Sequence, residues 1–183
     1  MLVRHGETEW SLSGQHTSRT DLELLDVGRE RAEAVGSELA GRTFAAVFSS
    51  PLRRALDTCR LAGFGDQVQV IDDLREWDYG EYEGLTTPQI RESRPDWNLW
   101  RDGCPGGETP AQVQERADRV LERVRGVGGD ALLFAHGHIL RVIAARWMGL
   151  GEDGGARLAL SAGAVSVLGF ERETQVLARW NAS

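Results

Sequence analysis

Residues 2–8 read LVRHGET, and residues 134–138 read FAHGH. In each stretch a short apolar run leads into a histidine followed by glycine, as expected where a buried parallel strand ends at the edge of a sheet. A third apolar run, residues 43–48, is soon followed by Arg53 and Arg54. We therefore expect three strand-to-helix junctions to bring two imidazoles and at least two arginines to one sheet edge, where they would form a pocket for a phosphoryl group.

The rest of the chain also alternates between strand and helix patterns. Apolar runs bounded by turn residues predict strands at residues 1–3, 43–48, 68–71, 131–135, 164–170 and 175–180. Amphipathic periodicity predicts helices at residues 26–40, from 51 to at least 59, 110–125 and 139–148. This alternation indicates an α/β fold, a three-layer α/β/α sandwich with a mostly parallel central sheet.

Three of the expected helices begin with capping signals. Asp26 is expected to cap the first helix. Ser50 is expected to cap the second, with Pro51 at its first position. Thr109 and Gln112 have the spacing of a capping box at the start of the third.

Length and composition exclude several classes of protein. A chain of 183 residues with 41% hydrophobic and 27% charged residues suits one globular domain, residues 1–183. Its net charge of −7 argues against nucleic acid or an anionic membrane as partner. No apolar run approaches the roughly 20 residues of a membrane span, and no signal peptide is visible. We expect a cytoplasmic protein, either a monomer or a homodimer.

Residue types narrow the chemistry further. The chain has no lysine, which excludes a Schiff-base lysine and a P-loop. A metal site is the competing hypothesis, because His136 and His138 together with His5 or His16 would supply three imidazoles. Arginines at the same edge would repel a cation, so we expect neither a metal nor a cofactor.

Residues 72–107 are acidic and aromatic and show no clear helix or strand pattern. A long irregular segment inside a compact domain is often functional. Its aromatic content favours an ordered structure. We expect it to form a lid that determines substrate specificity.

Together, these residues are similar to the motifs of the histidine phosphatase superfamily, whose members share the phosphoglycerate-mutase-like fold. The resemblance covers essentially the whole chain, in the order RHGET at 4–8, Thr20-Asp21 with Leu25 and Gly28, SPLRRA at 50–55, Glu76 with Gly80, Glu83 and Gly84, GGE at 106–108, and His136-Gly137. Segments 76–80 and 85–90 most resemble the bacterial broad-specificity acid phosphatases of this family.

The resemblance implies catalytic roles for individual residues. His5 is implied to be the nucleophile that forms a phosphohistidine. Arg4, Arg54 and His136 are implied to hold the phosphoryl oxygens and to stabilise charge in the transition state. Helical periodicity alone leaves the choice between Arg53 and Arg54 open, and the family pattern favours Arg54.

Glu76 is implied to donate a proton to the leaving oxygen and then to activate the attacking water. Protonating a poor leaving group is expected to accelerate the reaction about 10²–10⁴-fold. The step requires a protonated Glu76 and a neutral His5. Further acids crowd the same segment, namely Asp72, Asp73, Asp78, Glu81 and Glu83. Nearby like charge favours a protonated carboxyl, so we expect an acidic pH optimum.

The substrate is expected to be a small phosphorylated metabolite. Besides the phosphoryl-binding residues, the residues expected to contact it are Ser11, Thr17, Ser18, Tyr79 and Gly137. The mutases of the family hold phosphoglycerate with extra basic side chains, and this chain has Thr87 where they carry a lysine. Water is therefore the expected acceptor, as in a metal-independent acid phosphatase. A sugar-bisphosphatase and a cofactor-dependent phosphoglycerate mutase are the alternatives.

Overall fold

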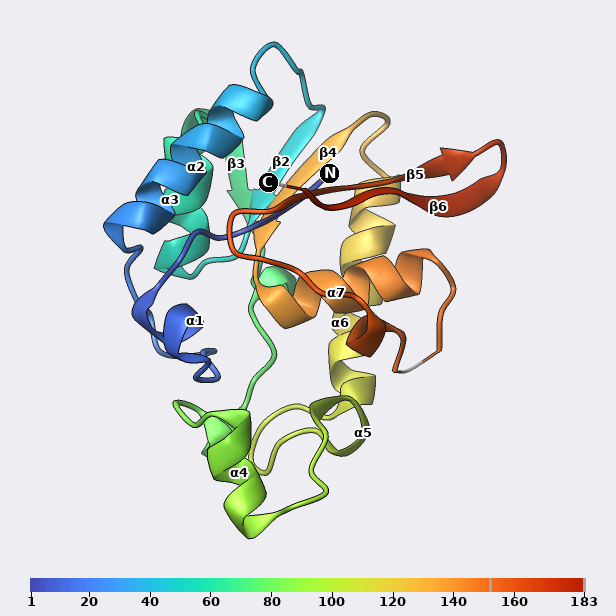
Figure 1. Ribbon diagram of the computed structural model, residues 1–183. Helices are drawn as coiled ribbons and strands as arrows, with labels where there is room; N and C mark the ends of the chain where they lie inside the picture. The colour runs from blue at the N-terminus through green and yellow to red at the C-terminus, as the bar shows by residue number, and fades with distance from the viewer. Residues whose placement is uncertain (152, 183) are drawn as a thin grey trace.

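A central sheet organises the computed structural model, which describes residues 1–151 and 153–182 (Figure 1). Within these residues the sheet has six strands in the order β3-β2-β4-β1-β5-β6. The strands are β1 (Leu2–Arg4), β2 (Ala46–Ser49), β3 (Val68–Val70), β4 (Ala131–Ala135), β5 (Val165–Glu171) and β6 (Thr174–Ala182). Strands β1 to β4 pair in parallel, whereas β5 runs antiparallel to β1 and to β6.

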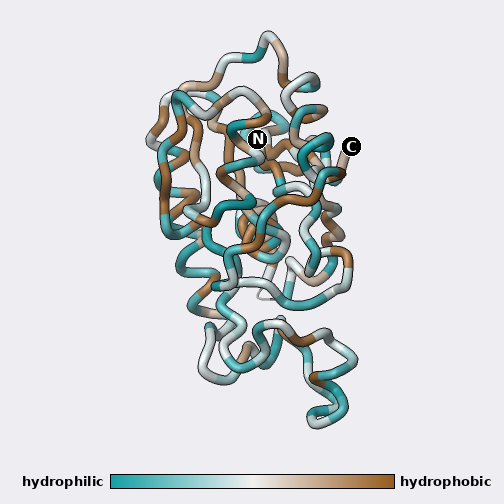
Figure 2. The backbone as a smooth tube through the Cα atoms, turned by 90° about the vertical axis from the view of Figure 1, so that its left-hand side faces the viewer, coloured by the Kyte–Doolittle hydropathy of each residue, from teal (hydrophilic) through white to brown (hydrophobic). Residues whose placement is uncertain are grey.

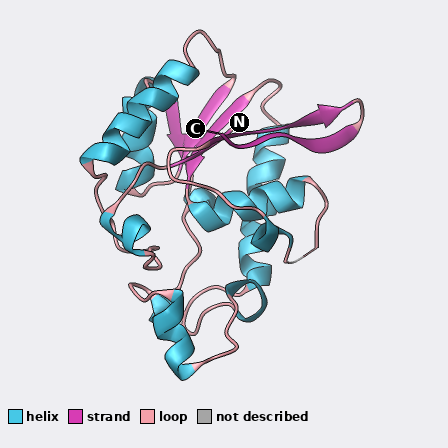
Figure 3. Cartoon of the chain, viewed as in Figure 1, coloured by secondary structure: helices cyan, strands magenta, loops and turns pink. Residues whose placement is uncertain are grey.

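Helices cover both faces of this sheet (Figures 1 and 3). One face carries α2 (Asp26–Glu38) and α3 (Arg53–Leu61), and the other carries α6 (Pro110–Arg125) and α7 (Gly137–Trp147). Alternate strand residues enter the two cores: Leu132 packs on the α2–α3 side and Leu133 on the α6–α7 side. The expected three-layer α/β/α fold is confirmed. No helix in the described part of the chain is both long and apolar enough to cross a bilayer.

The helix starts confirm one capping prediction and correct two. The Thr109–Gln112 capping box is present at α6, with Thr109 N–H donating to Gln112 Oε1 at 2.8 Å. Asp26 is the first residue of α2 rather than its cap. The second predicted helix, α3, begins at Arg53 instead of Pro51, because Leu52 still has extended backbone angles and takes the N-cap position, and the Ser50 hydroxyl bonds His136 instead.

Other boundaries shift by a few residues. Strand β2 occupies Ala46–Ser49 instead of residues 43–48, because its pairing with β4 begins only at Ala46 and Ala131. Helix α7 was expected at residues 139–148 and runs from Gly137 to Trp147. His136 has extended backbone angles and stands at the N-cap position of this helix, so Gly137 continues into the helix directly.

Residues 72–107 are less irregular than expected. They contain α4 (Thr87–Ser93) and α5 (Leu99–Asp102), together with 3-10 turns at Asp72–Leu74 and Gly80–Tyr82. The Thr86 and Gln89 side chains form a capping box at α4. Buried aromatic side chains hold the segment against the α6–α7 core, namely Trp77, Tyr79, Tyr82 and Trp97. It stands below the sheet as a cap, which we define as residues 72–107 (Figures 1 and 2).

Backbone hydrogen bonds join the early part of the cap, near Asp78, to the chain that leaves the cap near Pro105. The Glu108 N–H donates to the Asp78 carbonyl at 2.9 Å, and the Glu81 N–H donates to the Pro105 carbonyl at 2.9 Å. Gly80 has a φ of +52°, and a Cβ atom there would lie 2.2 Å from the Pro105 carbonyl oxygen. Only glycine fits both the left-handed backbone and this close approach. The loop that carries Glu76 is therefore fixed by its own backbone.

Three shorter elements complete the described chain. Helix α1 (Glu9–Ser13) follows β1, and its half-buried residues Trp10 and Ser11 line a cavity at the sheet edge. Further 3-10 turns lie at Gly65–Gln67 and Gly154–Arg157.

Candidate active site

The carboxyl ends of β1, β2 and β4 converge at one sheet edge, as the sequence predicts. Arg4 of β1 lies beside Ala135 of β4, so the next residues of the two strands, His5 and His136, become neighbours. Their ring centroids are 5.1 Å apart. Arg54 reaches the same point from the first turn of α3 and is fully buried.

In His5 one ring nitrogen is hydrogen-bonded to the backbone, and the other keeps a lone pair that can act as a nucleophile. Its Nδ1 lies 2.7 Å from the Gly6 carbonyl oxygen. A carbonyl only accepts, so Nδ1 carries the proton and Nε2 keeps its lone pair. Burial lowers the pKa of His5 well below its usual range, and the positive charges of Arg54 and Arg4 lower it further. The ring is therefore neutral near pH 7, as a nucleophile requires.

The backbone after His5 is held by a residue that sequence analysis missed. The Gly6 N–H donates to Thr58 Oγ1 at 3.1 Å, and Thr58 Oγ1 donates to the Arg54 carbonyl at 2.8 Å. A Cβ atom on Gly6 would lie 2.2 Å from the Gly28 carbonyl oxygen. The signal for Thr58 was present, because it lies four residues after Arg54 on the same face of α3.

His136 is fixed between Arg54 and Ser50. Arg54 Nε donates to His136 Nδ1 at 3.1 Å, and His136 Nε2 lies 2.7 Å from Ser50 Oγ. Burial lowers the pKa of His136 well below its usual range, with further lowering from Arg54 and His5. The ring is therefore neutral, with its proton on Nε2.

The structure distinguishes the two neighbouring arginines. Arg54 is 0% exposed and its NH groups donate to the carbonyls of Thr17, Ser18 and Thr20 at 3.0–3.3 Å. Arg53 is exposed and forms ion pairs on the surface. Arg54 is therefore the arginine that the fold brings to the histidines.

Arg4 supplies a second guanidinium on the other side of His5. One of its NH groups donates to the Leu160 carbonyl. Its Nε is buried and has no hydrogen-bond partner within the described residues. Burial lowers the pKa of Arg4, although the nearby Glu76 opposes this effect. A buried N–H without a partner is costly, so Arg4 fits a site that binds an anion.

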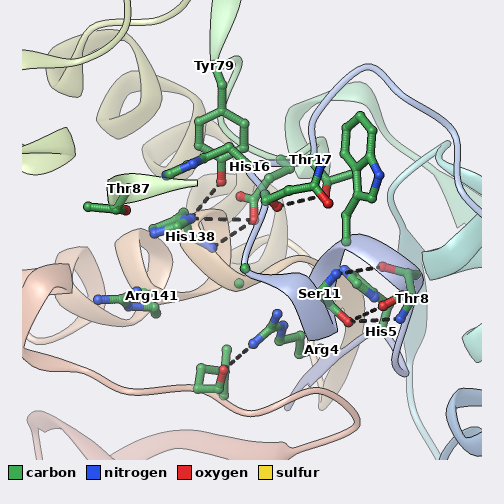
Figure 4. Close-up of a pocket in the computed structure, with 16 residues that line it drawn as sticks. Arg4, His5, Thr8, Ser11, His16, Thr17, Tyr79, Thr87, His138 and Arg141 are labelled. Atoms are coloured by element: carbon green, nitrogen blue, oxygen red, sulfur yellow. Dashed lines mark hydrogen bonds and ion pairs between the residues drawn. The ribbon is translucent and has the colours of Figure 1, made fainter. Parts of the chain in front are cut away.

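A cavity of about 250 Å³ lies at this edge (Figure 4). Its lining includes Arg4, His5, Ser11, Thr17, Glu76, Tyr79 and Gly137, all expected from sequence. Arg54 and His136 lie behind His5 and are fully buried. Ser18 is also buried outside the lining: its N–H donates to the Glu83 carboxylate at 2.9 Å and its carbonyl accepts from Arg54.

Glu76 is held by the N-terminus of α7. Its Oε1 accepts the N–H groups of Trp77 and Ile139, both at 2.9 Å, and its Oε2 accepts that of His138 at 2.9 Å. Amides at a helix start favour a carboxylate. The acid is 6% exposed and lines the cavity.

Three further acids of the cap have partners of their own. Asp73 pairs with Arg119, Asp78 pairs with Arg19, and the Glu83 carboxylate accepts the N–H groups of Ser18 and Thr20. The negative charges of Asp73, Asp78 and Glu83 are therefore offset by arginines or by backbone N–H groups.

The lining also contains residues that were not expected as substrate contacts, among them His16, Thr87, His138 and Arg141. His138 Nδ1 lies 2.6 Å from the Tyr79 hydroxyl, and its ring stacks parallel to His16 at 6.4 Å. Arg141 lies three residues after His138 on α7, which places both on one helix face. The sequence predicted that this helix starts at Ile139, so His138 could be assigned to the same helix face as Arg141 only after the structure showed that Gly137 begins the helix.

The three-imidazole metal hypothesis finds no matching geometry. Within residues 1–151 and 153–182, no group of three or more His, Cys, Asp or Glu side chains is arranged to hold a metal ion. Both ring nitrogens of His136 are already bound, to Arg54 and Ser50.

Comparisons with known proteins show which proteins this chain resembles. The model of the histidine phosphatase superfamily (branch 1) matches residues 1–183. An acid phosphatase from Mycobacterium tuberculosis is 46% identical over 184 residues, covering 97% of this chain and 89% of that protein. A sedoheptulose 1,7-bisphosphatase from Saccharomyces cerevisiae is 40% identical over 183 residues, covering 82% of this chain and 68% of that protein. A solved structure of an open reading frame product from M. tuberculosis has a TM-score of 0.95 at 45% identity, covering 100% of this chain and 96% of the other.

Proposed function

This chain belongs to the histidine phosphatase superfamily and is a phosphatase, and we propose that it hydrolyses small phosphomonoesters through a phosphohistidine on His5, without a metal ion. The observation that carries the proposal is the state of His5. Its Nδ1 proton is held by the Gly6 carbonyl at 2.7 Å, and the ring lines a cavity that also contains Arg4 and Glu76. A neutral imidazole beside a guanidinium and an acid suits nucleophilic attack on a phosphate ester.

In the first step, His5 Nε2 attacks phosphorus and the bond from phosphorus to the ester oxygen breaks. Negative charge on the phosphoryl oxygens is stabilised by the unpartnered Arg4 Nε–H and by the charge of Arg54 directly behind His5. One such positioned donor typically contributes about 10²–10³ to the rate. The neutral His136 donates its Nε2 proton to Ser50 Oγ, so it would act here by holding Arg54 in place.

Glu76 donates a proton to the departing oxygen. Its Oε1 accepts two N–H groups, which occupy both lone pairs, whereas Oε2 accepts only one. The transferable proton is therefore assigned to Oε2. In the second step the resulting carboxylate takes a proton from water, the water oxygen bonds to phosphorus, and the bond from phosphorus to Nε2 breaks.

Water is proposed as the acceptor. Thr87 lines the cavity where the mutases of the family were expected to place a lysine. Arg141 lines the same cavity, however, so a cation that could hold a carboxylate is present after all. The absence of the lysine at position 87 therefore does not by itself exclude a mutase, and the isomerisation of phosphoglycerate must be measured.

The proposal that the chain is an acid phosphatase rests on its similarity to the M. tuberculosis enzyme. The alternative, that the chain is a sugar-bisphosphatase, is supported by its similarity to the yeast enzyme. Both use the same step at phosphorus and differ in what holds the remainder of the substrate. The cytoplasmic location and the monomeric or homodimeric state stay predictions.

The test is release of inorganic phosphate at about pH 6 with EDTA present, near the middle of the range where a carboxylic acid and a neutral imidazole can act together. The panel contains 4-nitrophenyl phosphate, sugar mono- and bisphosphates, nucleotides and phosphoglycerates. We expect turnover by the native chain, none by His5→Ala, and a single added phosphoryl group on the native protein by mass spectrometry after quenching. Arg53→Ala is the matched control for Arg54→Ala, and only the latter is expected to lose most activity.

Three results would overturn the proposal. Turnover that persists in His5→Ala would remove the nucleophile. Turnover abolished by EDTA would require a metal. Interconversion of phosphoglycerate isomers without phosphate release would identify a mutase.

A further inference from the structure

We propose that Glu83 of the cap is a positioning residue, which holds Arg54 against the two histidines by acting through the backbone of residues 17–20. The inference rests on the proposed function, because the position of Arg54 matters to the reaction only if a phosphoryl group is bound beside His5. Glu83 lies outside the lining of the cavity. Its effect on the reaction is therefore indirect.

The Glu83 carboxylate binds two backbone N–H groups of the loop formed by residues 17–20. The Ser18 nitrogen lies 2.9 Å from each carboxylate oxygen, and the Thr20 N–H donates to Oε1 at 3.0 Å. Hydrogen bonds from backbone N–H groups to a carboxylate are charge-assisted and stronger than neutral ones. Glu83 therefore fixes both the position and the direction of the peptide groups in this loop.

The opposite side of the same loop binds Arg54. The NH1 group donates to the Thr20 carbonyl at 3.0 Å, and the NH2 group donates to the carbonyls of Thr17 and Ser18 at 3.2 and 3.3 Å. The remaining nitrogen, Nε, donates to His136 Nδ1. The guanidinium thus lies between the loop and the second histidine, and its position depends on where the three carbonyls are held.

One peptide group connects the two charges directly. The peptide unit between Thr17 and Ser18 donates its N–H to Glu83, and its C=O accepts from Arg54. The positive end of the peptide dipole therefore faces the carboxylate, and the negative end faces the guanidinium. Hydrogen bonds in such a chain polarise and strengthen one another. Glu83 and Arg54 thus form an ion pair that is bridged by a peptide group.

Arg54 has no closer counter-ion among the residues that the structure describes, since no carboxylate there lies within 4.0 Å of its nitrogens, yet its side chain is fully buried. A buried charge is costly unless it is compensated. Desolvation by burial lowers the pKa of Arg54, and the lowering is opposed by nearby groups, namely Glu76, Tyr79, Asp21 and Glu83. Of these, Glu83 is linked to the guanidinium through a hydrogen-bonded peptide group, so its charge also fixes the geometry.

Glu83 is itself held in place by the cap. It directly follows the 3-10 turn Gly80–Tyr82. The next residues bond the chain that leads into the loop: the Gly84 N–H donates to the His16 carbonyl at 2.8 Å, and the His16 N–H donates to the Leu85 carbonyl at 2.9 Å. The carboxylate therefore sits at a fixed distance from the loop, as the positioning of a guanidinium requires.

Hydrogen exchange of the Arg54 Nε–H measures this positioning without requiring catalysis. The group is buried and bonded to His136, so its NMR signal, assigned by its loss in Arg54→Lys, is expected to exchange slowly. Glu83→Gln keeps one oxygen but loses the charge, and we expect it to speed the exchange about tenfold or more. Arg19→Ala is the matched control, because it removes the ion pair of an exposed loop side chain with Asp78 of the cap and leaves the backbone bonds of the loop in place. We expect no change there.

Kinetics test whether the position matters to the reaction. A displacement of about 1 Å can cost about 10²-fold in rate, so we expect Glu83→Gln to lower kcat about 10–100-fold and Arg19→Ala to leave it unchanged. The loss should be equal on 4-nitrophenyl phosphate and on glycerol 3-phosphate, because Arg54 acts at phosphorus and not at the leaving oxygen. A loss confined to glycerol 3-phosphate would indicate a disturbed Glu76 and would overturn the proposal.

A double-mutant cycle tests whether Glu83 acts through Arg54. We expect Glu83→Gln to cause no further loss of kcat/KM in an Arg54→Ala background, because two residues that serve one arrangement are not additive. Glu83→Ala removes both oxygens and should lose more activity than Glu83→Gln. If Glu83→Ala does not fold, the isosteric Glu83→Gln still gives every readout.

The outcomes separate this proposal from the proposed function. Unchanged exchange of the Arg54 Nε–H in folded Glu83→Gln overturns the positioning role, and so do additive losses in the cycle. An equal change in Arg19→Ala also overturns it, because any link between loop and cap would then suffice. Faster exchange in a chain that releases no phosphate supports the positioning and contradicts only the proposed function.

Discussion

Arg54 Nε donates to His136 Nδ1 across 3.1 Å, and this single bond determines which proton the second histidine carries. A guanidinium has no acceptor, so the neutral imidazole must keep its proton on Nε2. That proton is directed to Ser50 Oγ at 2.7 Å. Ser50 and Arg54, which both lie where β2 leads into α3, therefore orient His136, the residue that follows β4.

Ser50→Ala tests this arrangement. The substitution leaves the His136 Nε2–H without its partner, and we expect a loss of about 1–3 kcal/mol in unfolding free energy and a fall of about tenfold in kcat. Ser49→Ala is the matched control, because Ser49 is an equally buried serine whose hydroxyl bonds only the Ser50 carbonyl, at 3.0 Å. We expect a loss of about 1 kcal/mol there and no change in kcat. Equal kcat values for Ser50→Ala and the native enzyme would show that Ser50 does not position His136.

Glu76→Gln is expected to act according to the leaving group. Glycerol 3-phosphate releases an alkoxide and depends on protonation, so its kcat should fall about 10²–10⁴-fold. 4-Nitrophenyl phosphate releases a stable phenolate and should lose much less. The control is Glu81→Gln, an exposed acid of the same segment. Equal losses on both substrates would contradict proton donation by Glu76.

The same role predicts an acidic optimum for the rate. The reaction needs a protonated carboxyl and a neutral His5, and burial together with Arg54 and Arg4 lowers the pKa of His5 well below its usual range. His5 therefore stays reactive in acid, and the requirement for a proton donor predicts a rate that declines toward pH 8. Measured profiles of kcat should show this alkaline decline in the native enzyme and lack it in Glu76→Gln. A flat native profile from about pH 5 to 8, with chemistry rate-limiting, would count against the assignment.

Stability is expected to change with pH in the opposite direction. All four histidines of the chain have lowered pKa values, chiefly through burial: His5, His16, His136 and His138. Below about pH 6.5 the unfolded chain binds protons that the folded chain refuses. The unfolding free energy is therefore largest above that pH and falls as the pH drops, by up to about 1.4 kcal/mol per pH unit for each histidine.

Urea unfolding at a series of pH values between about 7.5 and 5.5 measures this slope. His138→Asn removes one of the four groups, so its unfolding free energy should fall less steeply. A free energy that stays constant or rises toward acid pH would show that the histidines are not neutral in the folded protein.

Gly80→Ala tests the backbone contact that fixes the Glu76 loop. The new Cβ would lie 2.2 Å from the Pro105 carbonyl oxygen, in a backbone with φ of +52°. Gly128→Ala is the control, since Gly128 has a φ of +57° and nothing within 4 Å. We expect about 1–2 kcal/mol for the control, the cost of the left-handed backbone alone, and more than about 3 kcal/mol for Gly80→Ala. Similar losses in unfolding free energy for Gly80→Ala and Gly128→Ala would mean that the Glu76 loop shifts to accommodate the new methyl group at little cost.

The sequence predicted the sheet edge because the relevant signals are local. A buried strand, a histidine and a glycine recur at residues 2–8 and 134–138, and parallel pairing then forces His5 and His136 together. The Thr86 capping box carried an equally local signal, a threonine three residues before Gln89, and was overlooked within an irregular-looking segment.

Other features depend on long-range contacts and could not be read in advance. The antiparallel addition of β5 to β1 is set by pairing between residues more than 160 positions apart, such as Leu2 and Ser166. The role of Ser50 changed because its hydroxyl is used by His136 from another strand. Arg141 reaches the cavity from α7, which begins at Gly137, two residues earlier than expected.

The attachment of Glu76 to the amides of His138 and Ile139 has a consequence for how such an enzyme can diversify. The distance between acid and nucleophile is set by β1, β4 and the first turn of α7, and the Gly80–Pro105 contact closes the loop beneath it. Residues 84–101 lie outside this frame, and we expect that the exposed part of the segment can be lengthened, shortened or exchanged while Ile90, Trp97 and Leu99 keep it packed on the core. We expect substitution there to change which molecules are accepted and to leave the reaction performed on them the same.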